Sequence, residues 1–138
     1  MDETQARSAF EEALRTYHQD FNTFFLARLF GMKVEYGEDS CIVAMPVKDF
    51  MFNPQGSLHG GVTATVLDIS MGHLLKHHVG AGATLEMNIQ YIRAAREGTL
   101  TALSSFIRKG RQICFLRSEA TDDSGSIVAS ATSTWKVL

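Results

Sequence analysis

The chain has 138 residues, a formal net charge of −2 and a hydrophobic fraction of 45%, as expected for a single globular domain. The charge gives no support for general nucleic-acid binding, and no run of about 18 apolar residues marks a membrane span. The charged start of the chain lacks the apolar core of a secretory signal, and Cys41 and Cys114 form no CxxC pair, so we expect a cytoplasmic protein with free thiols.

The N-terminal segment, residues 1–30, has a helical pattern. Apolar residues recur at spacings of three and four over residues 3–29, which predicts an amphipathic helix. Asp20 and Asn22 interrupt this pattern in the middle. We therefore expect a break there, with two helical pieces in place of one.

The rest of the chain is rich in predicted strands. A hairpin is expected around the turn at residues 37–40, and later strands at residues 84–93, 99–108, 112–121 and 127–137. The last three are joined by short turns containing glycine, which implies antiparallel pairing of neighbours.

The stretch from residue 57 to residue 79 predicts one long apolar helix with Ser57 as N-cap. Gly60 and Gly61 fall in its first turn, where a glycine lets another chain or a ligand approach unpaired backbone N–H groups. An antiparallel sheet needs one face covered, and only this helix is long and apolar enough to cover it. The predicted fold class is therefore α+β: one domain over residues 1–138, with a curved antiparallel sheet wrapped around a central helix.

Asp68 is the only fixed charge between Asp49 and Lys76. On a helix it shares a face with small and apolar residues, so the carboxylate is expected to be partly buried, which is costly unless it is paired, hydrogen-bonded or used. One interpretation is an aspartate that bonds its neighbours or lies at an interface. The other uses the amides of Gly60 and Gly61, which can polarise a carbonyl while the carboxylate activates water.

His73 and His77 are spaced i and i+4, a spacing that can hold a metal ion. No third ligand of suitable type stands nearby, so we favour solvated or capping histidines and expect no metal.

A second charged feature is basic. Six cations fall within a span whose only acid is Glu97, and they are Arg93, Arg96, Arg108, Lys109, Arg111 and Arg117. They form either a solvated rim of the sheet or a landing site for a phosphorylated ligand.

These residues resemble a known family. The combination of Asn53, His59-Gly60-Gly61 and Asp68 with a helix-wrapped sheet is similar to the hotdog-fold acyl-CoA thioesterases, especially the phenylacetate-degradation and thioesterase superfamily member 2 types. The resemblance covers roughly residues 30–138, and the N-terminal helix matches only in kind.

The resemblance implies roles for individual residues. Asp68 corresponds to the general base or nucleophile, and Asn53 to the residue that positions water or the thioester. The Gly60 N–H corresponds to the donor that contacts the thioester carbonyl, with His59 in a supporting role. Thr84 stands near a position where relatives have a serine that assists the water. The residues that correspond to the substrate and coenzyme A path are Gly61, Tyr91, Arg108, Lys109, Gly110, Arg111 and Gln112.

The implied function is hydrolysis of an aryl- or fatty-acyl-CoA. No separate cofactor is expected, because coenzyme A is part of the substrate. The resemblance also implies a homodimer, commonly paired into a homotetramer, with sites at the dimer interface. Two alternatives remain: a hotdog dehydratase that uses His59 with Asp68 on a hydroxyacyl thioester, and a non-catalytic acyl-CoA-binding protein. The phenylalanines near the N-terminus are typical of a core, but a helix lying against an acyl pocket would show the same pattern.

Overall fold

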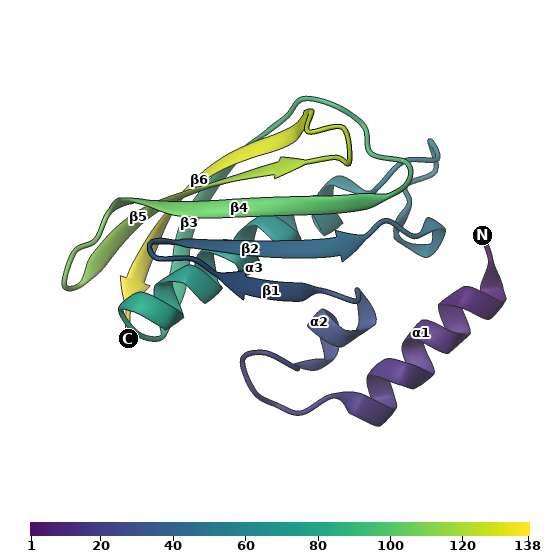
Figure 1. Ribbon diagram of the computed structural model, residues 1–138, viewed down its shortest axis with the longest axis horizontal. Coiled ribbons are helices and arrows are strands. Elements are labelled where there is room, and N and C mark those ends of the chain that lie inside the picture. Colours follow the sequence, from purple (N-terminus) through teal and green to yellow (C-terminus); the bar gives the residue numbers. More distant parts are fainter.

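Six antiparallel strands curve around one long helix in the computed structural model, which describes residues 1–138 (Figure 1). The helix is α3, Gly60–His78. The strands are β1 Lys33–Tyr36, β2 Ser40–Pro46, β3 Gly82–Tyr91, β4 Thr99–Arg108, β5 Ile113–Thr121 and β6 Ile127–Val137. The expected α+β architecture, a sheet wrapped around a central helix, is confirmed.

The order of strands in the sheet is β1-β2-β4-β5-β6-β3. The expected hairpins β1–β2, β4–β5 and β5–β6 are present and antiparallel. β3 does not pair with β4, which follows it in the chain. It pairs with β6 at the far side of the sheet, so β3 is an edge strand with one side unpaired.

The core lies between α3 and the inner face of the sheet. Fully buried residues of α3 include Val66, Leu67, Met71 and Leu74. The buried polar side chains here have partners: the Ser70 and Ser118 hydroxyls lie 2.7 Å apart, and Ser104 donates to the Ser70 carbonyl at 2.9 Å. Because these groups are satisfied, the helix is held against the sheet without unpaired buried hydroxyls.

The N-cap of the central helix lies two residues later than the sequence predicts. Ser57 does not cap it, because the Asn53 side chain binds Ser57: Asn53 Nδ2 donates to Ser57 Oγ at 3.1 Å. The N-cap is His59, whose Nδ1 accepts the Gly61 N–H at 2.9 Å. A histidine is an uncommon cap, so the sequence rules favoured the serine.

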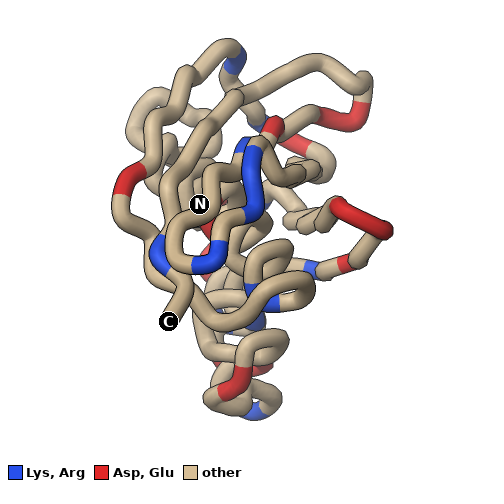
Figure 2. The backbone as a smooth tube through the Cα atoms, turned by 90° about the vertical axis from the view of Figure 1, so that its left-hand side faces the viewer, with Lys and Arg blue, Asp and Glu red and all other residues tan.

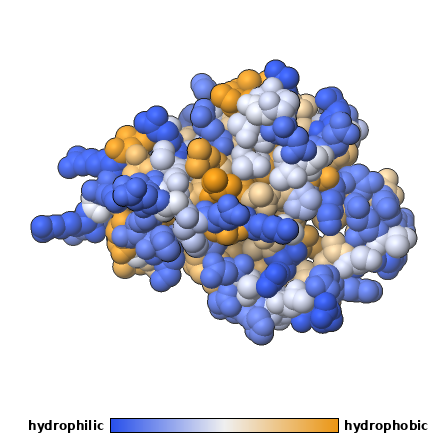
Figure 3. All heavy atoms as spheres, viewed as in Figure 1, coloured by the Kyte–Doolittle hydropathy of each residue, from blue (hydrophilic) through white to orange (hydrophobic).

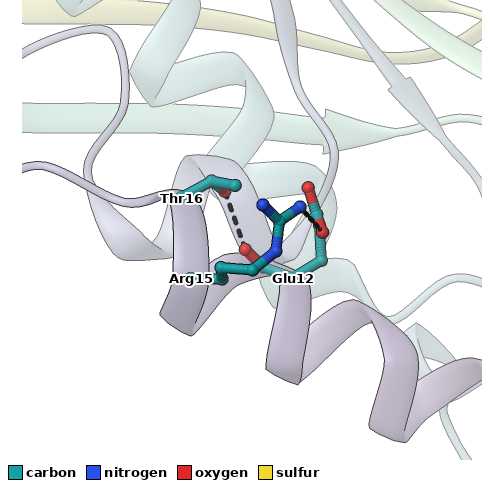
Figure 4. A network of polar contacts seen from close by, with 3 residues as sticks. All are labelled: Glu12, Arg15 and Thr16. Atoms are coloured by element: carbon teal, nitrogen blue, oxygen red, sulfur yellow. Dashed lines mark hydrogen bonds and ion pairs between the residues drawn. The ribbon is translucent and has the colours of Figure 1, made fainter.

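The N-terminal segment forms two helices, α1 Glu3–Thr16 and α2 Phe25–Leu29, so the expected break is confirmed. The last turn of α1 is held by a Thr16 hydroxyl that donates to the Glu12 carbonyl at 2.7 Å and by an Arg15–Glu12 ion pair (Figure 4). α1 lies beside α2 and away from the sheet (Figure 1), with Phe25 of α2 in edge contact with the aromatic rings of α1 and its C-cap. Residues 17–24 connect the two helices.

The surface carries apolar side chains among polar ones, as the face in Figure 3 shows. Exposed large apolar residues on β4 and β5 are Leu103, Ile107 and Phe115. None of the helices combines the length and apolar character needed to cross a bilayer.

Candidate active site

Asp68 lies in the middle of α3, next to the start of β3. The Thr84 hydroxyl donates to Asp68 Oδ1 at 2.8 Å, and no cation pairs with the carboxylate. Burial raises the pKa of the Asp68 carboxyl above its ordinary value, while the Thr84 hydrogen bond acts in the opposite sense. A partly buried carboxylate with a raised pKa and no salt bridge is suited to accept a proton.

Asp68 and Thr84 open onto a cavity of about 520 Å³, within the range of about 300–1,000 Å³ typical of ligand sites. Gly72 and Ile69 of α3 and Trp135 of β6 form part of its wall. A further part comes from the connection between α1 and α2, a contribution that no sequence pattern indicated. The lining residues from this connection are Gln19, Asp20, Phe21 and Phe24.

The backbone amides at the start of α3 differ in their partners. The Gly61 N–H is bound by His59 Nδ1, which leaves the Gly60 N–H without an acceptor in the chain. The positive end of the helix dipole adds to this free donor. The sequence-predicted assignment of Gly60 as the carbonyl contact therefore has a free N–H to support it, whereas the Gly61 N–H is occupied.

Tyr91, at the end of β3, packs over this helix start. Its hydroxyl donates to the Gly60 carbonyl at 2.8 Å, and a Cβ at position 60 would lie 3.4 Å from its ring. Asn53 lines the same surface depression of about 330 Å³ with Gly60 and Tyr91. Its side-chain Oδ1 accepts the Ser57 N–H at 3.2 Å, so Asn53 organises the loop that leads into α3.

The predicted site residues thus fall into two groups within one chain. Asp68 and Thr84 form an acid group in one cavity, and Asn53, Gly60 and Tyr91 form an amide group in another. Asp68 follows Gly60 by eight residues, which on an α-helix separates their backbones by about 12 Å. A base needs direct or single-water reach, so the two groups of one chain do not act on the same carbonyl. The same separation applies to His59 and Asp68 of one chain, so a dehydratase pair would also need a second copy.

The basic turn between β4 and β5 forms a third region. Arg108, Gly110, Arg111 and Gln112 line a shallow surface there, and Figure 2 views the molecule from the end where this turn and the C-terminus lie, with Lys and Arg segments facing the viewer. Lys109 is paired with Asp39 of the β1–β2 turn at 2.9 Å. The sequence gives no sign of this ion pair, because only the fold brings residue 39 beside residue 109.

The two histidines considered for metal binding have other partners. His73 is buried and its Nδ1 lies 2.7 Å from the Tyr36 hydroxyl, and burial lowers its pKa. His77 stacks on the Tyr36 ring at 4.1 Å. No group of three His, Cys, Asp or Glu side chains is arranged to hold a metal ion.

Comparison with known proteins decides the family. The model of the thioesterase superfamily matches residues 55–129, a span that holds α3 with Gly60 and Asp68. The chain belongs to the thioesterase superfamily. Its enzyme class is therefore thioester hydrolase, and the expected hotdog fold is confirmed.

Individual proteins similar to this chain include named acyl-CoA thioesterases. The medium/long-chain acyl-CoA thioesterase YigI of Escherichia coli is 29% identical over 140 residues, covering 88% of this chain and 87% of that protein. Acyl-coenzyme A thioesterase 13 of Mus musculus is 33% identical over 100 residues, covering 70% and 71%. Among solved structures, the BH2602 protein of Bacillus halodurans with CoA has a TM-score of 0.90 at 28% identity, covering 99% of this chain and 93% of that one.

Proposed function

We propose that the protein hydrolyses the thioester of an aryl- or fatty-acyl-CoA, with Asp68 as general base and the Gly60 N–H as donor to the carbonyl oxygen. The observation that carries the proposal is a partly buried Asp68 carboxylate that opens onto a cavity lined in part by apolar side chains, accepts the Thr84 hydroxyl and has no salt bridge. The relatives named as acyl-CoA thioesterases and the similar structure with CoA support the choice of substrate class.

In the proposed reaction, Thr84 occupies Asp68 Oδ1 and leaves Oδ2 to take a proton from water. The water oxygen attacks the thioester carbon, and the resulting oxyanion accepts the Gly60 N–H at the positive end of α3. The carbon–sulfur bond then breaks, and the proton on Asp68 passes to the leaving sulfur. The products are a carboxylic acid and coenzyme A with a free thiol.

We propose that Asp68 and Gly60 of one site come from two copies of the chain. Within one copy their backbones are about 12 Å apart along α3, too far for a shared water. β3 carries Thr84 and Tyr91 and has an unpaired edge with exposed Leu85 and Tyr91. An edge of this kind favours pairing with a second copy, which would bring Tyr91 and Gly60 of one chain toward Asp68 of the other. Assembly into a homotetramer and a cytoplasmic location stay predictions.

The basic turn is proposed to receive the phosphates of coenzyme A. Arg108 and Arg111 line the turn without an acidic partner, and a guanidinium binds phosphate in a bidentate geometry. Lys109 is a weaker candidate than the sequence implied, because Asp39 already neutralises part of its charge.

The test is release of free thiol, followed with a thiol-reactive dye, when purified protein meets a panel of acyl-CoAs. We expect turnover with at least one aryl or saturated acyl group. A parallel assay follows water loss from a 3-hydroxyacyl-CoA. Dehydration without thiol release would overturn the proposal in favour of a dehydratase, and binding without either product would overturn it in favour of a non-catalytic binding protein.

A further inference from the structure

The cavity beside Asp68 has one wall that belongs to neither the sheet nor α3. This wall is the connection between α1 and α2, which places Phe21 and Phe24 in the lining of the same cavity as Ile69 and Trp135. Phe21 is 42% exposed although it is a large apolar residue. An aromatic side chain left open at a cavity is in position to contact an apolar ligand.

The connection is a fixed turn and not a loose loop. The N–H and hydroxyl of Thr23 donate to Asp20 Oδ1 at 2.7 and 2.8 Å, and the His18 N–H donates to the Thr23 carbonyl at 3.0 Å. The Phe21 ring packs edge-on against buried His73, with centroids 4.7 Å apart. Phe21 is therefore held by the turn that carries it and by the contact of its ring with His73.

The part of the lining that Trp135 contributes is also fixed. Trp135 donates its Nε1–H to Ser133 at 2.7 Å and is 5% exposed. Gly72 permits this position, because a Cβ there would lie 2.9 Å from the Trp135 ring. The cavity thus has apolar side chains from the α1–α2 connection, α3 and β6 in its lining, with the Asp68 carboxylate opening onto it.

Resting on the proposed hydrolysis of acyl-CoA, we propose that Phe21 and Phe24 are specificity-determining residues that limit the length of the acyl group. The acyl chain extends from the thioester beside Asp68 between Trp135 and Ile69, and the two phenylalanines close its path. The substrates selected have an unbranched apolar acyl tail. Each methylene that finds space in the cavity adds about fourfold to kcat/KM, and the gain stops where the rings block further carbons.

The experiment measures kcat/KM for a series of saturated acyl-CoAs of increasing length with wild type, Phe21→Ala, Phe24→Ala and Phe24→Trp. The alanine variants are expected to move the optimum to longer chains, with about fourfold more relative kcat/KM for each additional methylene accommodated. Phe24→Trp is expected to move it to shorter chains. Phe10→Ala is the matched control, because Phe10 lies on α1 against Phe25 and does not line this cavity.

A second readout does not depend on turnover. Trp135 is the only tryptophan of the chain and lines the cavity, so its fluorescence reports acyl binding in an Asp68→Asn background. We expect the chain length that binds most tightly to shift in the phenylalanine variants as it does in kcat/KM.

The proposal is overturned if wild type hydrolyses acyl-CoAs but neither alanine variant changes the length profile, or if Phe10→Ala changes it equally. That result would leave the proposed function intact. Absence of thiol release from every acyl-CoA would instead overturn the proposed function itself. A loss of kcat/KM that is uniform across chain lengths, with no shift in the fluorescence titration, would also overturn this role, because a length limit must change ratios between substrates.

Discussion

Asp68 in the middle of α3 opens onto a cavity lined in part by aromatic and aliphatic side chains, whereas Gly60 at the start of the same helix lies at a smaller surface depression beside Tyr91. The environment of Asp68 suits a proton acceptor, and the environment of Gly60 suits a donor to a developing negative charge. Burial raises the pKa of Asp68 and makes it a better base, while the free Gly60 N–H and the helix dipole favour a developing negative charge. In the proposed mechanism one helix carries both groups of the site but keeps them about 12 Å apart, so each group would need its complement from another copy.

The largest expected effect on activity comes from changing Asp68 of the acid group. Asp68→Asn is expected to lower kcat/KM by about 10²–10⁴, the usual range for loss of a general base. Circular dichroism and size-exclusion chromatography should show an unchanged fold and assembly. Wild-type-like turnover in this variant would remove Asp68 from the mechanism.

The same variant has a stability signature. Because the folded-state pKa of Asp68 is raised above 3.8, its ionised form costs stability at neutral pH, and this cost disappears below pH 3.8, where the carboxyl is protonated in both folded and unfolded states. Asp68→Asn is thus expected to raise the melting temperature at pH 7 relative to wild type, with the difference shrinking in acid. An equal difference at both pH values would contradict this origin.

The next largest effect on activity is expected from changing Gly60 of the amide group. Gly60→Pro removes the free N–H at the first helical position, where proline fits the backbone, and is expected to lower kcat by about 10²–10³. Gly60→Ala is the matched control, because it adds a Cβ in ordinary contact with Tyr91 but keeps the N–H. Equal losses in both variants, measured by thiol release, would show that the side chain and not the missing donor is responsible.

A smaller effect is expected at Thr84. Thr84→Val removes the hydrogen bond that favours the ionised Asp68 and is expected to lower kcat/KM at neutral pH by about tenfold. The base must be ionised to act, so activity falls in acid, and this limb of the pH profile should move to higher pH in Thr84→Val. Thr84→Ser keeps the hydroxyl and should keep the wild-type profile.

The smallest effect concerns the basic turn, outside both groups. Asp39→Asn frees Lys109 from its exposed ion pair and is expected to lower KM for acyl-CoA by about two- to fivefold at low salt, since exposed pairs are weak. The difference should shrink at high salt because of screening. Glu38→Gln removes a neighbouring charge without touching Lys109, so an equal fall in KM there would point to net charge alone.

The sequence predicted those parts of the molecule that depend on local patterns. Alternation and short turns located β4, β5 and β6, and the isolated charge of Asp68 in an apolar helix marked the acid group. Local patterns misplaced the start of α3, because the Asn53–Ser57 contact and the His59 cap are side-chain choices that standard capping preferences do not favour.

Contacts between residues far apart in the chain could not be predicted from the sequence. No local sequence pattern indicates that β3 pairs with β6, that the connection between α1 and α2 lines the cavity of Asp68, or that Asp39 forms an ion pair with Lys109. These contacts join residues far apart in the chain, and each depends on the order of strands in the sheet. They are also the features that shape the cavity and modify the basic turn.

The sharing of one site between two copies is tested most directly by mixing subunits of Asp68→Asn and Gly60→Pro. Each variant alone is nearly inactive, but a mixed dimer holds one site with an intact Asp68 from one chain and an intact Gly60 N–H from the other. After exchange of differently tagged subunits, we predict recovery of roughly one quarter of wild-type thiol release, because half of randomly assembled dimers are mixed and half of their sites are intact. Proven exchange with no activity above that of the two parent variants would contradict the account.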